Sequence, residues 1–90
     1  MNTFLVSYDL IRPVKDYANL HAHLRSYFSW AKPLESVWLI KSNLGFAEVR
    51  DAIHGHMDGN DKLLVVDVTG RGAGWYHLSE DVSAWLKTNL

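Results

Sequence analysis

Ninety residues, 48% of them hydrophobic and 21% charged, predict one globular domain over residues 1–90 and exclude a disordered chain. The lack of cysteine excludes disulfides, thiol catalysis and zinc–thiolate sites, and a formal net charge of −1 disfavours an extensive nucleic-acid interface because phosphate contacts need Lys and Arg. Without a stretch near the ~20 apolar residues of a membrane span or an N-terminal secretory pattern, we expect a cytoplasmic protein with no membrane partner.

Residues 3–10 repeat apolar side chains with a period of two, Phe4 and Tyr8 among them. This pattern is typical of a strand that places one face on a core. Asp9 falls on the opposite side at the end of the strand, and Pro13 marks the loop that follows. The strand therefore ends on a carboxylate that points away from the predicted core.

A helix is predicted next, with Asp16 as a candidate N-cap and an end near Trp30. Its apolar positions follow helical spacing, and they are Tyr17, Leu20, Leu24, Tyr27 and Phe28. Pro33 excludes a helix after this point. Residues 34–42 are rich in β-branched and aromatic side chains, which predicts one strand or a bent pair of strands.

Helical spacing returns over residues 44–57, with Phe46, Val49 and Ile53 on one side. A turn follows at residues 59–61, rich in the residue types that favour turns. Residues 62–69 are then predicted to form an almost fully apolar strand.

The C-terminal segment is predicted to end in a short helix. Ser79 is its candidate N-cap, and the two acidic residues after it suit the positive end of the helix dipole. Val82, Trp85 and Leu86 form its apolar positions.

The glycine-rich residues 70–74 are interpreted as a flexible hinge that lets this tail reach a partner subunit. Trp75 and Tyr76 are the predicted docking residues, with base stacking as the alternative.

Together these elements predict an α+β fold, the ferredoxin-like β-α-β-β-α-β sandwich, over residues 3–70 with a helical C-terminal extension over 71–90. Helices cover one face of such a sheet, so the other face needs polar residues or a partner. A chain this small buries only somewhat over ~60% of the surface that its unfolded form exposes, which favours a homodimer.

The segments LVSYDL, SVW and NDKLLVVDV, in this order around two helices, resemble the small CRISPR-associated endoribonuclease family, whose dimers act in spacer acquisition. They are also similar to its stand-alone relatives, including the virulence-associated toxin D ribonucleases. The resemblance covers roughly residues 3–70. The chain departs from the family where Trp38 replaces a common phenylalanine, and where the tail from Gly70 is glycine-rich and then helical.

The resemblance implies a symmetric homodimer in which Asp9 of each protomer contributes one carboxylate to a site for Mg²⁺ or Mn²⁺. Mg²⁺ prefers oxygen ligands and keeps several waters, so this small ligand set is chemically acceptable. Antiparallel pairing of the first and last strands places Asp9 near Asp61 and Lys62, and it places Asp67 at the far end as a poor second ligand.

Two functions remain open. The first is a homodimeric metal-dependent nuclease that acts on phosphodiesters of RNA or DNA, with Asp9 as the catalytic metal ligand and with Arg12 and Lys15 positioning substrate phosphates. The second is a non-catalytic dimeric module that binds protein or nucleic acid. The near-neutral charge, the tryptophans and the glycine-rich segment 70–74 suit the second.

Two histidine pairs resemble metal ligands, His21 with His23 and His54 with His56. Positions two apart on a helix point to nearly opposite sides, unlike the i, i+4 spacing that puts two ligands on one face. We therefore expect no zinc site within either pair, and pairing across a dimer interface is the one arrangement that would create one.

Overall fold

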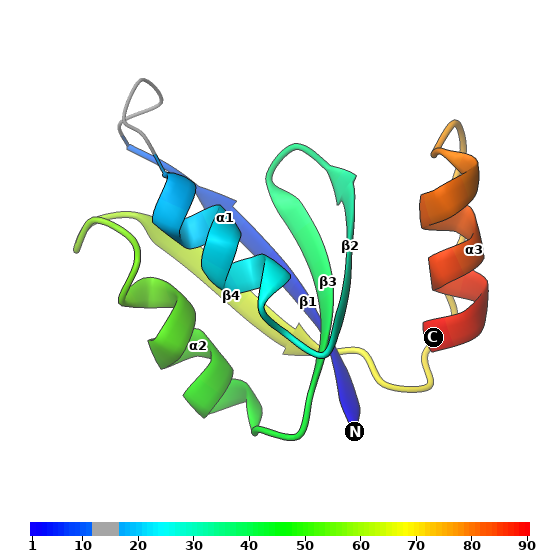
Figure 1. The fold of residues 1–90 in the computed structure, drawn as a ribbon, viewed down its shortest axis with the longest axis horizontal. Coiled ribbons are helices and arrows are strands. Elements are labelled where there is room, and N and C mark those ends of the chain that lie inside the picture. The colour runs from blue at the N-terminus through cyan, green and yellow to red at the C-terminus, as the bar shows by residue number, and fades with distance from the viewer. Residues whose placement is uncertain (12–16) are drawn as a thin grey trace.

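The computed structural model describes residues 1–11 and 17–90. Over these residues the chain forms a compact α+β domain (Figure 1). The strands are β1 (Asn2–Asp9), β2 (Ser29–Leu34), β3 (Val37–Ser42) and β4 (Lys62–Asp67), and the helices are α1 (Ala18–Arg25), α2 (Phe46–His54) and α3 (Glu80–Asn89). The predicted N-cap Asp16 and the predicted phosphate-binding residues Arg12 and Lys15 lie outside the described residues.

The four strands form one antiparallel sheet in the order β2-β3-β1-β4. Figure 1 shows α1 and α2 together against the sheet, with α3 apart from them beside β2. In each of the segments β1-α1-β2 and β3-α2-β4, the helix joins two strands that have a third strand between them. The two helices therefore lie over the same face.

The core fills the space between this face and the two helices. Every second residue of β1 from Phe4 to Tyr8 is buried there, as the period-two pattern predicts. The rest of the buried cluster comes from β3 and both helices, and it comprises Tyr17, Leu20, Leu24, Trp38, Ile40, Val49 and Ile53. The indole N–H of Trp38 donates to the hydroxyl of Tyr8 at 3.1 Å, so both polar groups are satisfied inside the core.

The predicted end of the first helix near Trp30 is wrong, because α1 ends at Arg25 and Trp30 belongs to β2. Helical spacing of aromatic residues continues beyond Arg25, but these residue types also favour strands. Pairing decides between them, since Trp30 and Ala31 lie opposite Ile40 and Leu39 of β3.

The bent pair of strands expected near residues 34–42 is present as the β2–β3 hairpin, whose first strand begins earlier than predicted. Its register shifts between Ala31 and Leu34, where Pro33 lacks the N–H that a regular ladder needs. Pro33 thus excludes a helix, as predicted, and is accommodated by the irregularity of an edge strand.

The tail folds back onto its own sheet. The hydroxyl of Ser79 caps α3 by accepting a hydrogen bond from the amide of Val82 at 3.2 Å, as predicted. The indole N–H of Trp85 donates to Ser29 of β2 at 2.7 Å, and Thr3 of β1 donates to the carbonyl of Asn89 at 3.0 Å. These contacts place α3 on the face opposite α1 and α2. No helix among the described residues is long and apolar enough to span a bilayer.

Candidate functional site

The face of the sheet that points away from α1 and α2 is built in rows, because residues opposite each other on antiparallel strands share a face. The first row is Ala31, Leu39, Leu5 and Val66; the second is Leu34, Val37, Ser7 and Leu64; the third is Asp9 and Lys62. Two mostly apolar rows thus cross the sheet, and the charged pair of the third row lies next to them.

The C-terminal helix α3 covers this face unevenly. In the first row, Ala31 and Leu39 are buried beneath the tail, and Leu86 of α3 is buried with them. In the second row, Leu34 is 59% exposed and Leu64 is 58% exposed. We call the second row together with Val66 the open face.

Asp9 borders the open face. It is exposed, it is the last residue of β1, and it lies opposite Lys62, as the sequence predicts. A shallow hollow of about 170 Å³ adjoins it, and Ser7, Lys62 and Leu64 contribute to its lining. An accessible carboxylate and an accessible ammonium group therefore stand side by side at the rim of an apolar surface.

Asp61, the neighbouring acid, has a structural role. Its side chain is only 6% exposed. One carboxylate oxygen accepts from the amide of Ile11 at 2.8 Å, and the other accepts from the hydroxyl of Tyr17 at 3.1 Å and the amide of Asp58 at 2.8 Å. The carboxylate joins the end of β1, the start of α1 and the turn before β4, so its oxygens are committed to the fold.

Asp67 lies at the other end of the sheet, opposite Phe4, which agrees with its predicted distance from Asp9. Its carboxylate accepts hydrogen bonds from the amide and hydroxyl of Thr69, and these bonds lower the pKa of Asp67. Within the described parts of the chain, no three His, Asp or Glu side chains converge as metal ligands. A hard cation at Asp9 therefore needs oxygen from water, substrate or a second chain.

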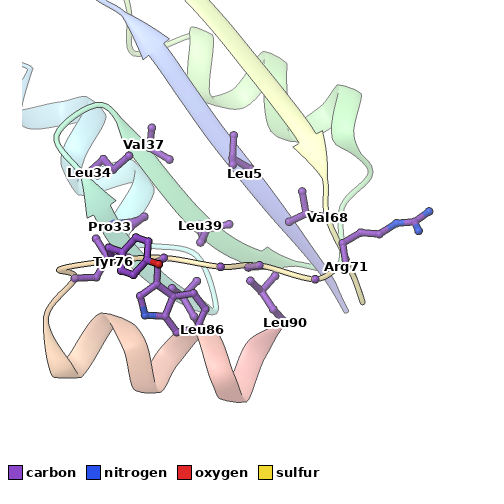
Figure 2. Close-up of a pocket in the computed structure, with 15 residues that line it drawn as sticks. Leu5, Pro33, Leu34, Val37, Leu39, Val68, Arg71, Tyr76, Leu86 and Leu90 are labelled. Carbon is purple, nitrogen blue, oxygen red and sulfur yellow. The ribbon is translucent and has the colours of Figure 1, made fainter.

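An apolar cavity of about 420 Å³ lies between the sheet and the tail. Leu5 and Leu39 line it from the sheet, and Leu86 of α3 and Leu90, the residue after α3, line it from the tail (Figure 2). Arg71, at one end, extends away from the other labelled side chains (Figure 2).

The predicted docking residues Trp75 and Tyr76 occupy different environments beside this cavity. The indole N–H of Trp75 donates to Ser83 of α3 at 3.0 Å, so this residue anchors the tail within its own chain. Tyr76 is 89% exposed. Of the two, Tyr76 is the residue available to a partner.

A second cluster joins the C-terminal ends of α1 and α2. The rings of His23 and His56 have centroids 4.6 Å apart and planes inclined by 31°. The Nε2 atom of His23 lies 2.9 Å from the hydroxyl of Tyr27. Burial, and then the charge of His56, lower the pKa of His23.

Sequence reasoning missed this cluster, because it tested His23 only against its neighbour in the helix. The i, i+4 spacing of His23 and Tyr27 was a usable signal for that contact. The approach of His56 depends on how the two helices pack. The structure thus pairs one histidine from each of the sequence motifs, within a single chain.

A scan against protein-family models found no match, and searches of curated proteins and of solved structures found no similar chain.

Proposed function

We propose that this chain is a ferredoxin-like, homodimeric, metal-dependent nuclease whose two subunits join through the open face and whose metal ligand is Asp9. The observation that carries the proposal is that Asp9 lies on the same side of the sheet as Leu64 and directly beside it in the row order. A second copy that covers Leu64 about a two-fold axis next to this corner brings two Asp9 carboxylates together.

The proposed fold class is supported by the element and strand orders. Antiparallel strands in the order β2-β3-β1-β4, with one helix in each of two split β-α-β segments, match the ferredoxin-like arrangement. In that arrangement α3 is the extension beyond the sandwich.

The proposed subunit contact is supported by β4. Its side chains are apolar on both faces, and Leu63 and Val65 pack against the core while Leu64 and Val66 remain exposed. Moving a large apolar side chain from water to full burial stabilises by roughly 1.5–3 kcal/mol. A second copy doubles each such gain, because a two-fold contact uses the same residues from both chains.

The donor chemistry at Asp9 suits a hard divalent cation. Its carboxylate is exposed and borders a hollow that admits water, and Mg²⁺ and Mn²⁺ accept carboxylate oxygen together with several waters. When bound, such an ion polarises a phosphodiester and promotes ionisation of a water ligand. Two Asp9 side chains would hold it, and Lys62 would position a substrate phosphate beside it.

The test is cleavage of labelled single-stranded RNA and double-stranded DNA, with and without Mg²⁺ or Mn²⁺. Asp9→Asn keeps the shape of the side chain and removes its charge. Asp51→Asn is the matched control, since Asp51 is an exposed acid of α2 that pairs with the adjacent Arg50 at 2.9 Å. We expect metal-dependent cleavage in the wild type and the control, and at least a hundredfold loss in Asp9→Asn, on the order of the contribution of one essential group.

Equal activity in wild type and Asp9→Asn would reject Asp9 as the metal ligand. Absence of cleavage in a wild-type protein that is shown to be dimeric would favour the second candidate, a non-catalytic dimeric module that binds protein or nucleic acid. The specific observation behind that candidate is the exposed Tyr76 next to an apolar cavity. It predicts that Tyr76→Ala weakens partner binding and that Asp9→Asn is silent.

A further inference from the structure

We infer that His23 and His56 form a two-imidazole binding site for a divalent transition-metal ion of tetragonal preference, Cu²⁺ or Ni²⁺, at the C-terminal ends of α1 and α2. The site is separate from Asp9 in place and in chemistry, since nitrogen ligands suit these ions and carboxylate oxygen suits Mg²⁺. It uses one chain only and does not depend on a dimer.

The ring separation suits a shared ion. Imidazoles that bind one metal through nitrogens at about 2.0–2.1 Å hold their centroids roughly 4.5–5.3 Å apart, and the shorter value corresponds to a right angle at the metal. The centroids of His23 and His56 are 4.6 Å apart, at the short end of this range. A right angle between two nitrogen ligands is the arrangement of square-planar or tetragonal Cu²⁺ and Ni²⁺.

The side chains of the two histidines differ in how far their surroundings restrict them. His23 is half-buried in the last turn of α1, where its ring also makes an edge contact with Tyr27 at a centroid distance of 5.0 Å. His56 is exposed and follows the end of α2. One ligand is thus held by the fold, while the other can turn toward an arriving ion.

Tyr27 sets the tautomer that binding requires. The phenol of Tyr27 is half-buried beside the ring of His23. When Nε2 of His23 donates to this hydroxyl across 2.9 Å, the lone pair of Nδ1 is free for a metal. Donation by the second ring nitrogen to a fixed acceptor is the usual support of a metal-bound histidine, and its loss typically weakens affinity by roughly 10–100-fold.

His54, in the last turn of α2, is outside the site. Its Nε2–H donates to the carbonyl oxygen of Asp61 at 3.4 Å, so this histidine contacts the turn before β4.

The 90-residue chain, prepared without a polyhistidine tag, is titrated with NiCl₂ at pH 7.5 by calorimetry. Electron paramagnetic resonance spectra are then recorded with Cu²⁺. We compare wild type, His23→Asn, His56→Asn, Tyr27→Phe and the control His77→Asn. His77 is an exposed histidine of the tail with φ of 62°, a conformation that Asn tolerates. Circular dichroism establishes that every variant is folded.

We expect one Ni²⁺ per chain and a Cu²⁺ spectrum with coupling to two nitrogens in wild type and His77→Asn. His56→Asn should bind at least tenfold more weakly, with coupling to fewer nitrogens, and Tyr27→Phe should weaken binding by roughly tenfold. Equal affinity in wild type and His56→Asn, or no saturable binding in the wild type, would overturn the inference.

Discussion

Both faces of the sheet carry large apolar residues, yet only one of them is covered along its length by α1 and α2. On the covered face, Phe4 and Trp38 are buried against α1 and α2. On the open face, Leu34 and Leu64 remain exposed although α3 covers the adjacent row. Hydrophobic pattern alone therefore does not show which face of the sheet the fold covers with α1 and α2.

The largest difference between the faces should appear on truncation of a core aromatic. Trp38→Ala removes a buried ring and the donor to Tyr8, and we expect the free energy of unfolding to fall by about 3–5 kcal/mol. Leu34→Ala on the open face is the matched change, with an expected loss of no more than about 0.5 kcal/mol in the monomer. Urea denaturation at low protein concentration measures both, and equal losses would erase the distinction.

Asp61 and Asp9 are neighbouring acids at the edge of the sheet, and they should differ in their effect on stability. Asp61→Asn keeps the volume but turns one acceptor into a donor among amides that need acceptors, so we expect a loss of roughly 2–4 kcal/mol. Asp9→Asn, on the open side, should change the free energy of unfolding by no more than about 0.5 kcal/mol. Chemical denaturation distinguishes them, and a stable Asp61→Asn would contradict the structural role of that carboxylate.

A charged residue introduced on the open face should prevent self-association and leave the stability of the monomer nearly unchanged. Leu64→Lys leaves the covered face intact, so we expect a change in monomer stability of about 0.5 kcal/mol or less. It should also abolish self-association, because a lysine cannot be buried without a partner charge. Sedimentation equilibrium is the measurement, with Phe28→Lys as a control at an exposed position elsewhere. Loss of dimer in both variants, or in neither, would place the interface elsewhere.

The smallest expected effect concerns His23, between the helices of the covered face. Its pKa is lowered from the ordinary value of 6.5 in the folded protein, by burial and then by His56. The unfolded chain therefore binds more protons below pH 6.5, and stability should fall as the pH drops through this value. Thermal unfolding between pH 7.5 and 5.5 should show a shallower slope for His23→Asn. An identical slope would rule out His23 as a source of the pH dependence.

At the candidate site, the sequence predicted the positions of the carboxylates but not their roles. Alternation placed Asp9 off the core face, and antiparallel order placed Asp61 and Lys62 near it, both of which are confirmed. Pattern could not distinguish the roles of the two acids. Burial of Asp61 depends on Tyr17 and Ile11, which the chain brings to it from a distance of many residues.

In the tail and the first helix, local sequence patterns predicted the helix cap correctly but not the docking of α3 or the end of α1. The Ser79 cap was predictable because a cap acts within three residues. The sequence pattern predicts a tail that reaches another subunit. In the structure, α3 packs on its own sheet through Trp85 and Ser29. The helix predicted to end near Trp30 ends earlier because residues from Ser29 onward pair with β3, and this pairing outweighs the helical spacing.

Alternation, helical spacing and capping are set by neighbours a few residues apart, so these patterns predicted the α+β class and most of the order of strands and helices. The packing of the folded chain sets which rows of the sheet α3 covers, which acid is buried, and that His23 lies against His56. These features are contacts between segments distant in the chain, and their energies depend on packing geometry that no local pattern encodes.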